Sequence, residues 1–180
     1  MDDVWRQAMM VEMNIEVSGE LSGILEMLKQ MALFETKIAE MYSVCASMWK
    51  EDGQFWLDIW RDELRHARHI EQMMDIIRKK PGRFQAGRPF NVHALATVVR
   101  DIVQKTEMLR NGEITQERFL FIAQSYEEGY IEDKYGEIVK TDDVEYQTLM
   151  REIVSDTWQH KDRIIHHILD SAEKKGYIKT

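Results

Sequence analysis

The chain has 180 residues and a mass of 21.4 kDa, with 44% hydrophobic and 31% charged residues, 9 glycines and 2 prolines. This composition is typical of one globular domain, here residues 1–180, and excludes collagen-like and disordered chains. The net charge of −8 opposes binding to nucleic acid or to an anionic membrane surface. A single cysteine, Cys45, excludes an internal disulfide and a cysteine-built zinc or iron–sulfur site. We therefore expect a cytoplasmic protein without a nucleic-acid or membrane partner.

Helical spacing of apolar residues runs through most of the chain. Residues 1–19 are expected to form an N-terminal extension, and a bundle is expected over about residues 20–175. The strongest break in the pattern contains both prolines, Pro81 and Pro89. The predicted long helices are 20–50, 54–79, 115–139 and 143–174, with a shorter helix at 92–110. The predicted fold class is therefore all-α, an antiparallel four-helix bundle whose second and third helices are joined by a long crossover, residues 80–114, that carries the shorter helix.

Carboxylates and imidazoles interrupt the apolar, inward-facing side of each long helix. They are Glu35 on the first helix, Glu63 and His66 on the second, Glu128 on the third and His160 on the fourth. The spacing repeats between the two halves, because Glu35 precedes His66 by 31 residues and Glu128 precedes His160 by 32. This repeat favours Glu128 over its neighbour Glu127. Each of the two glutamates also precedes a tyrosine by seven residues, Tyr42 and Tyr135.

Ionised carboxylates inside a bundle are costly unless they are paired or bind a metal, and no lysine or arginine shares these faces. Divalent metal ions would neutralise them and accept the neutral imidazoles as ligands. Oxygen-rich sites with a few imidazoles suit iron or manganese, whereas zinc favours four closed ligands. The predicted metal ligands are Glu35, Glu63, His66, Glu128 and His160, with Glu132, Asp156 and Glu127 as further candidates.

Other side chains are predicted to hold these ligands in place. Asp62 and Asp156 are spaced to accept a hydrogen bond from a histidine ring across the bundle. Tyr42 and Tyr135 are either core aromatics or hydrogen-bonding partners of the ligands.

Glu35, Glu63-Leu64-Arg65-His66, Glu128 and His160 together resemble the rubrerythrin branch of the ferritin-like di-iron carboxylate proteins, over about residues 20–175. The resemblance implies a ferritin-like bundle with a di-iron centre that reduces peroxide or dioxygen, or oxidises ferrous iron, with no catalytic residues beyond the metal ligands. It also leads us to expect a homodimer or a higher homo-oligomer.

The chain departs from this family pattern in two ways. Thr157 stands where the second Glu-x-x-His of the pattern has its glutamate, so we expect the His160 half to bind its metal more weakly. One cysteine also cannot build the rubredoxin-type iron domain of rubrerythrins, so a redox-active centre would need a separate electron donor.

Three interpretations of function stay open at this point. The first is a non-haem iron oxidoreductase, with manganese or zinc as alternatives to iron. The second is an iron-binding or storage protein without turnover. The third is a degenerate, metal-free helical bundle that acts as an interaction module, an interpretation that Thr157 keeps open.

Overall fold

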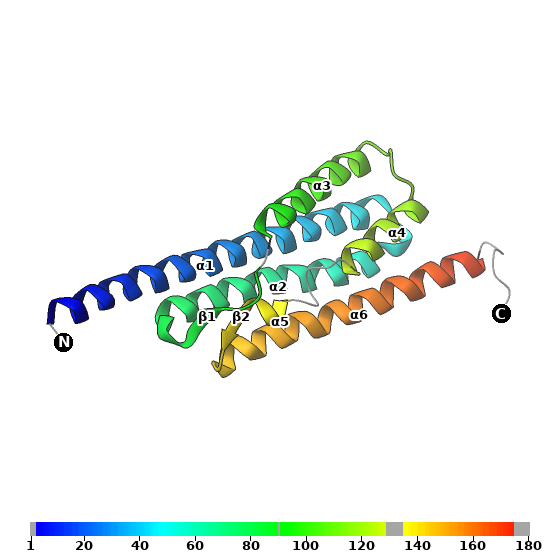
Figure 1. Ribbon diagram of the computed structural model, residues 1–180. Helices are drawn as coiled ribbons and strands as arrows, with labels where there is room; N and C mark the ends of the chain where they lie inside the picture. The colour runs from blue at the N-terminus through cyan, green and yellow to red at the C-terminus, as the bar shows by residue number, and fades with distance from the viewer. Residues whose placement is uncertain (1–2, 90, 129–134, 175–180) are drawn as a thin grey trace.

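Several long helices packed against one another make up most of the molecule (Figure 1). The computed structural model describes the backbone of residues 3–89, 91–128 and 135–174, and the side chains of residues 19–89, 91–128 and 136–173. The helices are α1 (Asp3–Met48), α2 (Gly53–Lys79), α3 (Val92–Arg110), α4 (Gln116–Glu127), α5 (Tyr135–Ile138) and α6 (Val144–Lys174). In the part of the chain that is described, no helix is long and apolar enough to cross a membrane.

Three of the predicted helices, 54–79, 92–110 and 143–174, are confirmed within a residue as α2, α3 and α6. The first helix is much longer than predicted, because α1 begins at Asp3 and runs without interruption to Met48. Its N-terminal end extends past the other helices (Figure 1).

α1 and α2 form a helical hairpin around a single 3-10 turn, η1 (Lys50–Asp52). Gly53 opens α2 very close to the preceding helix, since a Cβ at this position would lie only 3.2 Å from the carbonyl oxygen of Ala46. Glycine therefore permits the tight turn. At its other end α2 stops at Lys79, just before Pro81, because the residue before a proline is disfavoured in helical conformation.

A short antiparallel sheet was not foreseen from the sequence. β1 (Phe84–Ala86), which follows the 3-10 turn η2 (Pro81–Arg83), pairs with β2 (Val139–Thr141) just before α6. Strands of three residues are too short to show the alternation by which strands are recognised. The pairing continues at Gly87, whose N–H donates to the Ile138 carbonyl at 2.7 Å.

The third predicted helix, 115–139, is confirmed as far as Glu127, whereas its last residue, Val139, lies in β2. Residues 129–134, in its second half, lie outside the described residues. α4 begins behind the Thr115 N-cap and ends at Glu127. Gly129 follows directly in the sequence, and glycine commonly terminates helices. The described chain resumes with one turn of helix, α5, and then enters β2, where Val139 is buried. The apolar spacing near residue 139 therefore reflects burial of Ile138 and Val139.

The helices that matter for the site are held by a continuous apolar core. α1 packs along α2 and α3, and α6 packs along α2 and α4. Where α1, α2 and α4 meet, the Tyr42 ring stacks on Trp56 with ring centroids 5.5 Å apart, and Trp56 meets Phe119 edge-on at 5.1 Å. All three rings are fully buried. Large buried aromatic side chains contribute strongly to core stability, so this group fixes the relative positions of the three helices.

Asp143 ties the beginning of α6 to the end of α2. Its Oδ1 accepts from the backbone N–H of Tyr146, as an N-cap, and its Oδ2 accepts from Lys80 at 2.9 Å and from Arg83 at 3.0 Å. The side chain is buried, and the charge of Lys80 holds the pKa of the Asp143 carboxyl below its usual range. One carboxylate therefore anchors two elements that are far apart in the sequence.

We expect Asp143→Ala to lower the free energy of unfolding by about 2 kcal/mol or more, because it removes a helix cap and the buried acceptor that Lys80 and Arg83 share. Asp142→Ala is the matched control, since Asp142 also accepts from Arg83 but is exposed. Its cost should be about 0.5 kcal/mol. Urea denaturation of both variants measures the difference, and equal losses would contradict this role of Asp143.

Candidate metal centre

Five side chains of metal-binding types converge in the core between α1, α2, α4 and α6. They form two groups of three, in each of which one ligand atom per residue lies within 4.8 Å of the others. The first group is Glu35, Glu63 and His66, and the second is Glu63, Glu127 and His160. All five are at most 5% exposed.

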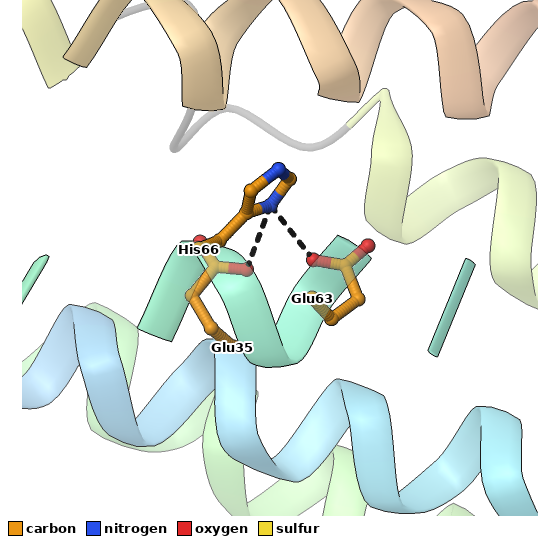
Figure 2. A group of neighbouring side chains, drawn as sticks. All are labelled: Glu35, Glu63 and His66. Carbon is orange, nitrogen blue, oxygen red and sulfur yellow. Dashed lines mark hydrogen bonds and ion pairs between the residues drawn. The ribbon is translucent and has the colours of Figure 1, made fainter. Parts of the chain in front are cut away.

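Glu63 belongs to both groups and uses a different carboxylate oxygen in each. Its Oε2 lies 3.1 Å from Nδ1 of His66, and its Oε1 lies 3.0 Å from Nδ1 of His160. Glu35 from α1 approaches the same His66 nitrogen at 3.7 Å (Figure 2). Glu127 from α4 approaches the same His160 nitrogen at 3.7 Å. The two groups are thus alike in composition and in geometry, with Glu63 between them.

Helix geometry explains why these residues meet. Glu63 and His66 are three residues apart on α2, so both side chains lie on one face of the helix, which is the face buried against α1 and α6. The two imidazole rings stack with centroids 5.6 Å apart. Tyr42, on α1, donates from its hydroxyl to Oε1 of Glu127 at 2.6 Å and so fixes that carboxylate.

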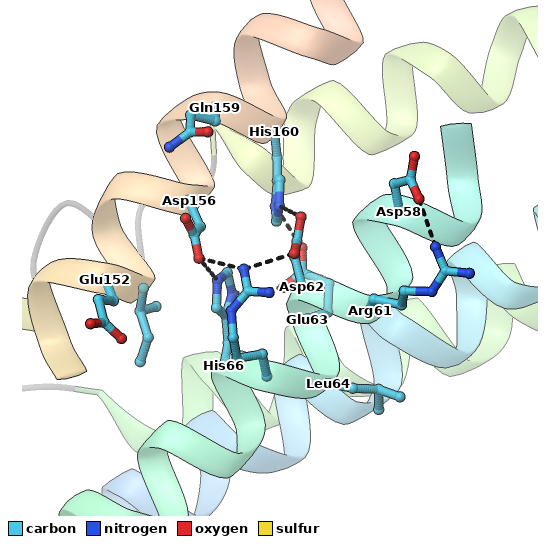
Figure 3. Close-up of polar contacts among 12 residues, drawn as sticks. Asp58, Arg61, Asp62, Glu63, Leu64, His66, Glu152, Asp156, Gln159 and His160 are labelled. Atoms are coloured by element: carbon cyan, nitrogen blue, oxygen red, sulfur yellow. Dashed lines mark hydrogen bonds and ion pairs between the residues drawn. The ribbon is translucent and has the colours of Figure 1, made fainter. Parts of the chain in front are cut away.

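The outer nitrogen of each imidazole faces an aspartate on the opposite helix, as the sequence predicted. Nε2 of His66 lies 3.3 Å from Asp156, and Nε2 of His160 lies 3.1 Å from Asp62 (Figure 3). Each of the helices α2 and α6 therefore supplies one histidine and the aspartate that orients the other histidine.

Arg65 joins these two aspartates. Its Nη2 lies 2.7 Å from Asp62 and 2.7 Å from Asp156. The hydrogen bond from His66 holds the pKa of Asp156 at about 2, and the neighbouring Arg65 adds to this effect. One guanidinium thus links both histidine–aspartate pairs into a single chain of charge-assisted contacts.

Glu128 and Asp156 lie outside both groups of the described residues. Glu128 is exposed at the end of α4, where its Oε1 accepts from Gln124 at 3.0 Å and lies 3.7 Å from Lys161. The ligand position that the repeat assigned to Glu128 is held by Glu127. Glu132 lies outside the described residues, as does the side chain of Tyr135. Asp156 contacts His66 on the side away from the carboxylates, so it is not among the five.

Thr157 is buried, but its hydroxyl donates to the Ile153 carbonyl within α6 at 3.0 Å. It therefore does not replace a carboxylate ligand. Because Glu63 serves both groups, each group nevertheless contains two glutamates and one histidine. Among the described residues, the two groups therefore do not differ in their number of carboxylates, and the weaker metal binding expected of the His160 half stays a prediction. With threonine at position 157, the centre lacks a second carboxylate that both groups could share, as they share Glu63.

The carboxylates of the centre do not all have the same ionisation state in the absence of a metal. Burial raises the pKa of Glu35 to about 8, and the negative charge of Glu63 adds to this increase. Burial also raises the pKa of Glu127, again with a contribution from Glu63. The core thus favours the neutral form of both outer glutamates, unless a cation is placed beside them.

Burial would also raise the pKa of Glu63, but the charges of His160 and His66 outweigh it and hold that pKa well below its usual range. Burial would lower the pKa of His160, but Glu63 and Asp62 outweigh it and raise the pKa to about 12. The pKa of His66 is raised in the same way, mainly by Asp156. In the metal-free protein, protons on the two imidazoles therefore supply the positive charge that Glu63 requires.

The donor atoms fit metal ions in place of these protons. An Nε2–H that donates to an aspartate leaves the lone pair of Nδ1 directed at the carboxylates, which is the tautomer of a metal-bound histidine. Nδ1 of His160 and Oε2 of Glu127 are buried, and neither makes a hydrogen bond to a described residue. Ligand atoms about 3 Å apart can bind one ion at metal–ligand distances of about 2.1 Å.

Sequence reasoning missed two features of this centre. The choice between Glu127 and Glu128 depended on one residue of spacing, and the sequence does not show which of the two accepts from Tyr42. The linking role of Arg65 was also missed, because its two partners lie on different helices.

Comparison of the chain with models of known protein families, with curated proteins and with solved structures finds no match.

We expect Arg65→Gln to weaken metal binding about tenfold, because the link between the two aspartates is lost, and Asp62 then keeps only the more distant Arg163, at 3.6 Å. Arg61→Gln is the matched control, since Arg61 lies one turn earlier on α2 and pairs only with Asp58 among the described residues. Competition with a chromogenic chelator measures both affinities. Equal affinities of the two variants would show that Arg65 has no part in the centre.

Proposed function

We propose that this chain is a ferritin-like protein that binds two divalent metal ions, iron or manganese, in the centre formed by Glu35, Glu63, His66, Glu127 and His160. The observation that carries the proposal is the position of Glu63, which directs one carboxylate oxygen to each histidine. A carboxylate in this position can bridge two ions, and it needs a positive charge on both sides.

The chemistry of the donor set supports iron or manganese. Three carboxylates and two imidazoles, with no thiolate, form the oxygen-rich type of site that these metals occupy. Zinc in proteins favours a closed set of four ligands, which neither group supplies alone.

The origin of the ligands supports the ferritin-like assignment. In ferritin-like centres, two helices supply one glutamate each, and two others supply Glu-x-x-His. Here α1 and α4 supply Glu35 and Glu127, α2 supplies Glu63 and His66, and α6 supplies His160 with Thr157 at the remaining position. Within the ferritin-like proteins, we propose the rubrerythrin branch because of the sequence resemblance alone.

The reaction class that follows is reduction of peroxide or dioxygen, or oxidation of ferrous iron as substrate. Bound iron would supply redox electrons and Lewis acidity. The protein's own residues fix the ligand geometry. Tyr42 orients Glu127, Asp62 and Asp156 orient the histidines, and the buried aromatic side chains around Trp56 exclude bulk water. The described residues contain one thiol, the buried Cys45, so electrons would come from a separate donor.

A metal-free interaction module is the second candidate, and a specific observation favours it. Protons on both histidines balance the charge of Glu63 without any metal, and Thr157 removes one carboxylate of the family pattern. A metal-binding assay on the purified protein distinguishes the two candidate functions. A metal-free interaction module, in which protons alone balance the charge of Glu63, would bind no iron, manganese or zinc.

Single substitutions of the glutamates test the bridging arrangement. We expect Glu63→Gln to abolish binding of both ions, because it removes a ligand from each group. Glu35→Gln and Glu127→Gln should each leave one ion per chain. Glu128→Gln, next to Glu127 but exposed, is the control and should keep two. Elemental analysis of the purified variants measures these stoichiometries, and loss of metal from Glu128→Gln alone would place the centre elsewhere.

We expect Thr157→Glu to tighten metal binding about tenfold or more, because a fourth carboxylate adds negative charge opposite Glu63. Thr157→Gln is the control, since it has the same size without the charge. Binding titrations with Mn²⁺ compare the two variants with the native chain. If Thr157→Gln tightens binding as much as Thr157→Glu, charge is not what this position lacks.

A further inference from the structure

A cavity of about 720 Å³ is lined by residues of β2, α5 and the first turns of α6. Its lining includes Arg88, Lys140, Tyr146, Met150 and Arg151. Met150 precedes His160 by ten residues on α6, or about 15 Å along the helix, so the cavity is separate from the metal centre. Its volume is in the range that holds small organic molecules.

The cavity joins an apolar wall to an excess of positive charge. Val139 and Met150, both buried, provide apolar surface. The charge of Arg88 is balanced by Glu137 at 3.1 Å. Lys140 and Arg151 have no ion pair with any described residue. In a chain with a net charge of −8, two cations that have no ion pair among the described residues and lie beside one cavity favour an anionic ligand.

Tyr146 provides an independent indication of a ligand. The residue is 3% exposed, and its hydroxyl is buried without a hydrogen-bond partner in the described part of the chain. Buried hydroxyl groups nearly always have a partner. Burial also raises the pKa of Tyr146, so the hydroxyl remains protonated and available as a donor.

We propose that this cavity binds a small organic carboxylate with an apolar body, such as a medium-chain fatty acid. Arg151 and Lys140 attract the carboxylate, the Tyr146 hydroxyl donates to it, and Met150 and Val139 contact the apolar part. This site does not depend on metal binding by the centre described above.

Three probes test the chemistry of the ligand on the full-length protein. Octanoate should bind saturably with one molecule per chain in isothermal titration calorimetry. 1-Octanol, which lacks the charge, and inorganic phosphate, which lacks the apolar body, should each bind at least tenfold more weakly. Amide chemical shifts should change at residues 136–151. Binding of octanol or phosphate as tight as that of octanoate, or shift changes confined to other regions, would overturn the proposal.

Substitutions locate the interaction. Arg151→Gln should weaken octanoate binding about tenfold. Arg100→Gln is the matched control, because Arg100 donates to the hydroxyl of Thr97 three residues earlier, just as Arg151 donates to that of Thr148, and both arginines are exposed. The control should bind octanoate like the native chain, and equal affinities of the two variants would contradict the site.

Tyr146→Phe separates binding from folding. The variant should bind octanoate several-fold more weakly, yet be no less stable, because the hydroxyl that it removes has no described partner in the free protein. A loss of stability together with unchanged octanoate affinity would assign the hydroxyl to the fold and overturn its role in binding.

Discussion

The placement of three carboxylates in the apolar interior is the constraint on which the rest of the structure depends. Glu35, Glu63 and Glu127 are each at most 5% exposed, and the cationic side chains that reach the centre contact its outer aspartates. An uncompensated buried charge would cost several kcal/mol, which is a large fraction of the net stability of a domain. Positive charge must therefore reach the centre, either as protons on the histidines or as metal ions.

Each histidine can either carry a proton or bind a metal, because an aspartate on the opposite helix fixes the orientation of its ring. Asp156 on α6 holds His66 on α2, and Asp62 on α2 holds His160 on α6. With the outer nitrogens fixed in this way, the inner nitrogens face Glu63 whether they carry a proton or bind a metal. Arg65 joins the two aspartates at the surface, so the orientation of one histidine is coupled to that of the other. We regard this preorganised arrangement as the structural basis of the proposed two-metal centre.

Helical spacing was sufficient to predict most of the helices and to bring Glu35, Glu63, His66 and His160 to one interior, because side-chain direction in a helix follows directly from residue number. The choice between neighbouring glutamates at 127 and 128 could not be made in the same way. It depends on how α4 is rotated against α1 and α6, and packing sets this rotation. The β1–β2 pairing was hidden for a related reason, since it joins two three-residue segments more than fifty residues apart.

The central claim is that Glu63 lies between two metal ions, and anomalous diffraction tests it most directly. Crystals grown with Mn²⁺ should show two anomalous peaks per chain, one beside Nδ1 of His66 and one beside Nδ1 of His160, with a Glu63 oxygen bound to each. The absence of any peak between α1, α2, α4 and α6, or a single peak that Glu63 does not contact, would contradict the account.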